Sequence, residues 1–89
     1  MIRMFIRHDV ADYGAWRRAY DAFDPERRQM GVVGEAVYLS TEKDRDVTVF
    51  HDFENLEAAK AFIASQRLRE VMGAAGVTSV PTIWFTRPA

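Results

Sequence analysis

The first nine residues alternate between apolar and polar side chains, which predicts a strand with one covered face. One side of this strand carries Ile2, Met4, Ile6 and His8, and the other carries Arg3, Phe5 and Arg7. Asp12 then offers an N-cap for a helix. The aromatic face of that helix follows steps of three, four and three residues: Tyr13, Trp16, Tyr20 and Phe23.

Further along the chain, short apolar patterns are separated by capping and turn residues. Asp24-Pro25-Glu26 ends the first helix, and a short second helix is expected from Pro25 to Met30, stopping at Gly31. "GEAVYLS" and "DVTVFHDF" predict an antiparallel hairpin joined by "TEKDR". Asn55 caps a helix whose apolar stripe changes phase at Ser65, which predicts two short helices ending at Gly76. "VPTIWF" predicts a last strand that begins at Pro81 or lies at an edge.

The element order is strand, helix, two strands, helix, strand, which predicts an α+β fold of the ferredoxin-like βαββαβ type with a four-stranded antiparallel sheet. We expect residues 1–89 to form a single domain. We expect the first and third strands to lie at the centre and to run parallel. A chain of this size buries only roughly 60–65% of its unfolded surface, so burial by self-association would help to stabilise it.

Helices can cover only one face of such a sheet, and the other face combines aromatic and charged residues. We expect this reverse face to pack against a second copy of the sheet in a homodimer, because single domains seldom expose such patches. Arg3 or Arg7 would then need an acid such as Asp52 or Glu35, since an unpaired buried charge is costly. The predicted dimer interface comprises Arg3, Phe5, Arg7, Phe50 and Asp52, with Thr48 beside them.

Two histidines fall on the face that should meet the helices. His8 ends the first strand and His51 lies near the end of the third. In parallel neighbours about 4.8 Å apart these ends share one edge, so both rings can contribute to one site as candidate catalytic residues. Apolar walls with a few convergent polar groups are typical of a small-molecule pocket. The candidate ligand-binding residues are Tyr13, Trp16, Tyr20, Phe23, Phe53 and Phe62. A structural role is the alternative, in which neutral histidines and the aromatic stripe belong to the core.

Charge and composition narrow the classes of function. The net charge is -1 with both signs interspersed, which disfavours nucleic acid as a partner. The chain has no cysteine, no signal-peptide pattern and no apolar run long enough for a membrane span, so we expect a cytoplasmic protein. Asp9 and Asp52 alternate with the histidines and should point to the opposite face, so we expect no metal site. We expect no cofactor either, since Gly31 and Gly34 precede no phosphate-binding helix.

Several stretches together resemble a known family. These are "RHDVADYGAW", "FD" at 23–24, "VTVFHDFENLEAAKAF", "SQRLREVMGAAGV" and "PTIWF". They are similar to short dimeric α+β barrel proteins labelled cyclases or antibiotic-biosynthesis-monooxygenase-like proteins. The resemblance implies sheet-to-sheet pairing of two chains and a ligand slot between helices and sheet. It covers nearly the whole chain and is specific for fold rather than for reaction.

Residue by residue, the resemblance carries over in part. The family's opening pattern matches Arg7, His8, Tyr13 and Trp16, and an acid and an aromatic residue stand at Asp52 and Phe53. His51 stands where relatives more often have an apolar residue. The haem-degrading branch of the superfamily resembles this chain less, because its asparagine has no counterpart beyond the helix cap Asn55.

Within this resemblance, the expected function is binding of a small aromatic or polyketide-like metabolite, with cofactor-free monooxygenation or polyketide cyclisation as the reaction. His8 or His51 would act as the base, with Trp16 and a tyrosine hydroxyl as donors to an oxyanion. A cyclase would use the same pocket to fold a polyketide and move protons. A non-catalytic small-molecule-binding protein and a purely structural dimer fit the same residues.

Overall fold

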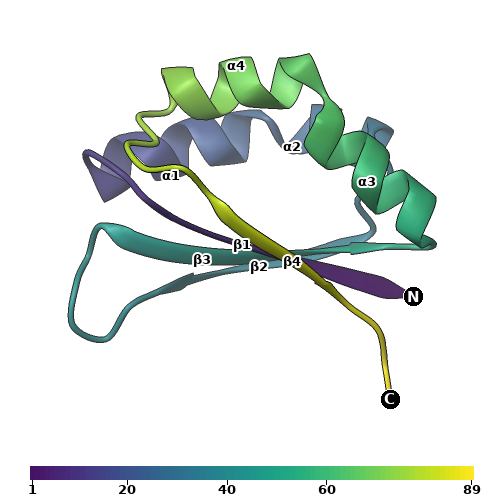
Figure 1. Cartoon of the computed structure of the whole chain (residues 1–89). Coiled ribbons are helices and arrows are strands. Elements are labelled where there is room, and N and C mark those ends of the chain that lie inside the picture. Colours follow the sequence, from purple (N-terminus) through teal and green to yellow (C-terminus); the bar gives the residue numbers. More distant parts are fainter.

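The computed structural model describes all residues 1–89 and contains four strands and four helices. In chain order they are β1 (Ile2–Asp9), α1 (Tyr13–Ala22), α2 (Asp24–Gln29), β2 (Gly34–Leu39), β3 (Asp46–Phe53), α3 (Leu56–Ala64), α4 (Gln66–Ala74) and β4 (Thr82–Thr86). Figure 1 shows all four helices on one side of the sheet, with the other side uncovered. No helix is long and apolar enough to cross a bilayer.

The sheet has the order β2-β3-β1-β4, and every neighbouring pair is antiparallel. This confirms the ferredoxin-like α+β fold and the central position of β1 and β3. The expectation that these two strands run parallel is wrong. In a split βαβ unit the strand inserted between the two parallel strands runs against both, and β3 is that inserted strand between β1 and β2.

The helix boundaries follow the capping residues. The three side-chain caps are Asp12 accepting from the Ala15 amide (2.8 Å), Asn55 from the Ala58 amide (2.9 Å) and Ser65 from the Leu68 amide (3.3 Å). Ser65 adopts an extended conformation and separates α3 from α4, as the change of apolar phase predicts. Gly31 and Gly76 have φ values of 99° and 87°, a region that side chains other than glycine rarely adopt, so the chain can turn sharply after α2 and α4.

The core lies between the helices and the covered face of the sheet. Alternate residues of β1 and β3 point into it, including Met4, Ile6, Val49 and Phe53, all buried. Met4, Ile6 and Phe53 pack with Phe62 and Leu68 of the helices and with Phe23 between α1 and α2. Val49 belongs to a second cluster, with Trp16 and Val47. The strand periodicity read from the sequence therefore assigns the core face correctly.

The uncovered face carries a row of aromatic rings that crosses the sheet. Phe5 stacks on Trp84 of β4 at 5.1 Å between ring centroids and meets Phe50 of β3 edge-on at 6.1 Å. Trp84 is 40% exposed. Sequence reasoning placed Phe5 and Phe50 here correctly but overlooked Trp84, which the register with β1 aligns with Phe5.

Both arginines on this face pair with aspartates of β3. Arg3 donates to both carboxylate oxygens of Asp52 at 2.8 and 3.0 Å, and Arg7 binds Asp46. The pairing of Arg3 with Asp52 agrees with the expectation. Glu35, the alternative partner, lies on the helix side instead, because its neighbour in the β2–β3 register is His51.

Candidate functional site

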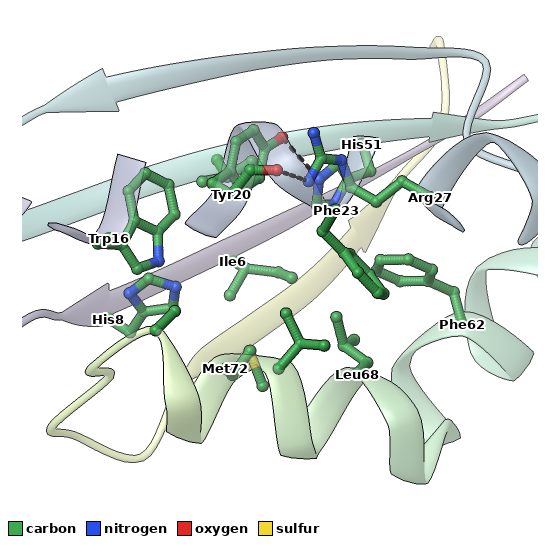
Figure 2. A pocket seen from close by; sticks show the side chains of 13 residues that line it. Ile6, His8, Trp16, Tyr20, Phe23, Arg27, His51, Phe62, Leu68 and Met72 are labelled. Carbon is green, nitrogen blue, oxygen red and sulfur yellow. Dashed lines mark hydrogen bonds between the residues drawn. The ribbon is translucent and has the colours of Figure 1, made fainter. Parts of the chain in front are cut away.

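A small cavity lies between the helices and the covered face of the sheet, where α4 passes over β1 and β3. Its volume is about 40 Å³, room for about three water molecules. Ten of its lining residues are labelled in Figure 2, where Leu68 and Met72 project into it from α4. The thirteen residues are Ile6, His8, Trp16, Tyr20, Phe23, Arg27, Val49, His51, Phe62, Leu68, Val71, Met72 and Ala75.

Most of the side chains that the sequence singled out meet at this cavity. His8, His51, Trp16, Tyr20, Phe23 and Phe62 all line it. Tyr13 does not, although its ring packs against Trp16 at 6.0 Å. Phe53 is fully buried behind Phe62, with 5.4 Å between ring centroids, and belongs to the core. Whether the lining residues contact a ligand stays a prediction.

The two histidines reach the cavity from different ends, not from one edge of the sheet. His8 pairs with Val47 and His51 pairs with Met4, four residues apart along β1, a separation of about 13 Å at strand spacing. The antiparallel direction of β3 accounts for this correction. Figure 2 shows His8 under Trp16 at one end and His51 beside Arg27 toward the other.

His51 takes part in a hydrogen-bonded chain that runs from the cavity to the edge of the sheet. Its Nε2 lies 3.0 Å from the Tyr20 hydroxyl, and that hydroxyl makes a short hydrogen bond to Glu35. An ionised carboxylate can only accept, so the tyrosine proton points to Glu35 and His51 Nε2 must be the donor to the tyrosine oxygen. His51 is therefore protonated on Nε2, and its Nδ1 carries the free lone pair.

Arg27 of α2 is the buried cation of the site. Its side chain is only 3% exposed, and its guanidinium stacks 3.7 Å above the Tyr20 ring. It donates to the Tyr20 carbonyl and forms ion pairs with Asp24 (3.3 Å) and Glu35 (3.2 Å). Arg28, on the outer side of the same helix, also binds Glu35 at 3.0 Å.

Sequence reasoning missed the place of Arg27 in the cavity wall. The sequence nevertheless contains a pattern that predicts this position of Arg27. The stripe of Trp16, Tyr20 and Phe23 continues to Arg27 by one more step of four residues, the spacing of one helical face. This pattern was overlooked because Pro25 interrupts the helix, and the continuation of the same face into α2 was not considered.

Three buried side-chain atoms in the protein have no hydrogen-bond partner: His8 Nδ1, Arg27 Nε and His51 Nδ1. All three residues line the same cavity. Buried polar groups are nearly always paired, so each exception in a folded protein requires an explanation. The three atoms comprise one fixed donor on Arg27, one fixed acceptor on His51 and one imidazole nitrogen on His8.

Burial determines the charge state of these groups. It lowers the pKa of His51 to about 3, helped by the positive charge of Arg27, and it also lowers the pKa of His8. Both imidazoles are therefore neutral near pH 7. Burial, and then the hydrogen bond to Glu35, raise the pKa of the Tyr20 hydroxyl, so Tyr20 keeps its proton.

The side chains around the cavity do not form a metal centre. No group of three or more histidine, cysteine, aspartate or glutamate side chains lies close enough together to hold a metal ion. Asp52 follows His51 but points to the opposite face, where it binds Arg3.

Neither the family models nor the curated proteins include a match to this sequence. The fold, by contrast, is similar to several solved structures. An antibiotic biosynthesis monooxygenase aligns with a TM-score of 0.77 at 8% identity, covering 100% of this chain and 99% of its own. SnoaB, a cofactor-independent oxygenase from Streptomyces nogalater, aligns with a TM-score of 0.75 at 14% identity, covering 99% and 94%.

A third structure contains a bound ligand. It is a monooxygenase from the gene ActVA-Orf6 of Streptomyces coelicolor in complex with nanaomycin D, with a TM-score of 0.69, 16% identity, and coverage of 99% of this chain and 87% of its own. Similarity at this level of identity concerns the backbone. This chain has the ferredoxin-like fold of the antibiotic-biosynthesis-monooxygenase-like proteins.

Proposed function

We propose that this protein binds a small aromatic, polyketide-like metabolite in the cavity beneath α4 and oxygenates it without a cofactor. The observation that carries the proposal is the convergence of three unpartnered buried polar atoms, on His8, Arg27 and His51, at one aromatic cavity. A ligand with a hydroxyl and a neighbouring carbonyl would satisfy two of them. The hydroxyl would donate to His51 Nδ1, and the carbonyl oxygen would accept from Arg27 Nε.

The same contacts support the first step of cofactor-free oxygenation. Removal of a proton from a phenolic or enolic substrate gives an electron-rich anion that can react with dioxygen. Arg27 would stabilise the developing oxyanion in a site of low polarity, where such an interaction is strong. Apolar side chains such as Phe62 and Leu68 would exclude water from that anion. The similarity to SnoaB, a cofactor-independent oxygenase, supports this reaction class.

The cavity must enlarge to admit an aromatic ring system, since its volume is only about 40 Å³. Helix α4 is the wall that can move. The extended Ser65 precedes it and Gly76, with its positive φ, follows it, and one ion pair, Arg67–Glu26 at 2.8 Å, joins its side chains to α2. We infer that ligand entry displaces α4 about these two ends.

A homodimer is part of the proposal. Two copies packed through the reverse face would cover the aromatic row of Phe5, Phe50 and Trp84, which no helix covers. Phe5→Glu should then give a protein of half the native mass in light scattering while its far-UV circular dichroism is unchanged. Equal masses for the variant and the wild type would refute this interface.

Binding can be measured through Trp16, because the protein has two tryptophans and Trp84→Phe leaves only the one in the cavity wall. The probe is juglone, a hydroxynaphthoquinone with a hydroxyl beside a carbonyl. Saturable quenching of Trp16 is expected in this background and should be lost in His51→Leu. Glu42→Gln, an exposed change in the β2–β3 loop, is the control. Absence of saturable quenching would overturn the proposed site.

Turnover is tested with anthrone, which enolises and whose methylene carbon can be oxidised. Reaction with an equimolar amount of dioxygen gives anthraquinone and water, so oxygen uptake and product absorbance must rise together. The rate should persist with a metal chelator and fall in Arg27→Met. Juglone binding without oxygen uptake would identify a non-catalytic binding protein, and would refute the oxygenase part of the proposal.

A further inference from the structure

We propose that Tyr20 and Glu35 form a proton relay that lets His51 take a proton from the ligand without becoming charged. This inference rests on the proposed function, because it concerns the base of that site. It assigns roles to two positioning residues: Tyr20 sets the tautomer of His51, and Glu35 is the final proton acceptor.

The relay has continuous geometry. His51 Nε2 and the Tyr20 oxygen are 3.0 Å apart, and the Tyr20 hydroxyl donates to Glu35. Glu35 in turn lines a second hollow, of about 370 Å³, between α1, α2 and β2, which it shares with Tyr20 and Arg27. Tyr20 and Arg27 also line the inner cavity. They therefore form the wall between the two spaces, and the hydrogen-bonded chain passes through this wall.

A relay is needed because His51 is a poor base on its own. An imidazolium in this position is strongly disfavoured by burial and by the charge of Arg27, so simple protonation of Nδ1 would not compete near pH 7. Transfer through the ring avoids that charge. As Nδ1 accepts the ligand proton, Nε2 passes its own proton to Tyr20, and Tyr20 passes the hydroxyl proton to Glu35.

The protons and charges balance in this transfer. The ligand loses one proton and becomes an anion, and the Glu35 carboxylate gains one proton and becomes neutral. His51 and Tyr20 end neutral, with His51 now protonated on Nδ1. One negative charge has moved from Glu35 to the ligand, and Arg27 adjoins both positions, through its ion pair with Glu35 and its unpartnered Nε. The charge of Arg27 is thus compensated before and after the transfer.

Charged side chains of α2 surround Glu35, the proton acceptor of the relay. Arg27 and Arg28 contact it, and Asp24 of the same helix binds both of these arginines. Arg17 from α1 lies near Tyr20, and Asp52 follows His51 on β3.

Two substitutions separate proton transfer from positioning. Glu35→Gln keeps an oxygen that can accept from Tyr20 but removes the ability to take up a proton. Tyr20→Phe removes the hydroxyl and breaks the chain to His51. Glu42→Gln makes the same chemical change at an exposed loop position and serves as the matched control.

The first experiment measures the His51 tautomer by nitrogen-15 NMR on the protein without ligand. Wild type, Glu35→Gln and Glu42→Gln should all show the proton on Nε2. Tyr20→Phe should lose this single tautomer, because nothing else holds the Nε2 proton. A wild-type His51 protonated on Nδ1, or a Tyr20→Phe spectrum unchanged from wild type, would overturn the relay.

The second experiment follows the ionisation of bound juglone, whose visible band moves to longer wavelength when its hydroxyl loses the proton. Below the pH at which free juglone ionises, wild type and Glu42→Gln should bind it as the anion. Glu35→Gln should bind it with the band of the neutral molecule. An anion band retained in Glu35→Gln would overturn the relay alone, whereas no binding by wild type would overturn the proposed function and the relay together.

Discussion

The two faces of the sheet carry the same kinds of side chain, arginines, carboxylates and aromatic rings, in opposite surroundings. On the reverse face Arg3 and Arg7 are 47% and 59% exposed while they bind Asp52 and Asp46. On the helix side Arg27 is 3% exposed and binds Asp24 and Glu35. In both places an arginine also lies over an aromatic ring, Arg3 over Phe50 and Arg27 over Tyr20.

This difference in burial decides what each group can do. Water screens the charges of the reverse face, so those pairs contribute little to the free energy of unfolding. Beneath the helices, the charge of Arg27 acts on His51 and Tyr20 through a medium of low polarity. A buried site of this kind can keep its histidines neutral and leave polar atoms without hydrogen-bond partners, and a ligand can then bind to these atoms. The proposed ligand chemistry therefore uses the helix side, and the proposed dimer would use the reverse face.

The largest contrast is expected from the two adjacent arginines of α2. Arg27→Ala should lower the free energy of unfolding by about 3–5 kcal/mol, because it removes one partner of a buried ion pair. Arg28→Ala removes the other cation that binds Glu35, but Arg28 is 48% exposed, and the loss should be at most about 1 kcal/mol. Urea denaturation measures both. Equal losses for the two variants would contradict the contrast between buried and exposed pairs.

The next largest effect concerns pH. His51 has a pKa of about 3 in the folded protein and about 6.5 when unfolded. Between these values the unfolded chain binds a proton that the folded chain does not, so the folded state loses stability as the pH falls. From pH 7 to pH 5 the loss from His51 should be about 2 kcal/mol, and His8 acts in the same direction.

Denaturation midpoints at the two pH values measure this loss, and His51→Leu should reduce it. The interval avoids the carboxyl groups of Glu26 and Asp46, whose pKa values lie below their usual range because they bind Arg67 and Arg7. If the pH dependence is unchanged in His51→Leu, then water reaches this ring and burial does not lower its pKa. His51 would then resemble the exposed groups of the reverse face.

The smallest effect is expected at Arg7, and it sharpens the comparison. Arg7→Ala should cost at most about 1 kcal/mol in a dilute, monomeric sample, because its pair with Asp46 is exposed. If two copies bury this face, the loss of stability should be larger at high protein concentration, and this additional loss should disappear on dilution. A cost independent of concentration would contradict the dimer, and would leave both arginines as ordinary surface groups.

Local signals in the sequence were sufficient to predict the helices and strands. Asp12, Asn55 and Ser65 mark where helices begin, and their hydrogen bonds reach only three residues along the chain. The alternation in β1 and β3 assigned the core face for the same reason, since side-chain direction along a strand depends on nothing distant. Sequence reasoning also recognised the aromatic stripe of α1.

Two errors concern the direction or register of one strand against another. The direction of β3 against β1 separates His8 from His51, and the register of β2 turns Glu35 toward Tyr20 instead of Arg3. Periodicity alone cannot reveal either, because it describes one element at a time. Arg27 was missed for a different reason, because Pro25 interrupts the helical stripe that continues from Phe23 to Arg27.

By itself the sequence determined the elements, their order, the core face of the sheet and most of the aromatic lining, because these depend on contacts between near neighbours in the chain. Only the tertiary structure decided that His51, Tyr20, Glu35 and Arg27 form one buried network. Its members come from β3, α1, β2 and α2. Their interaction depends on distances and burial that arise only when helices and sheet pack together.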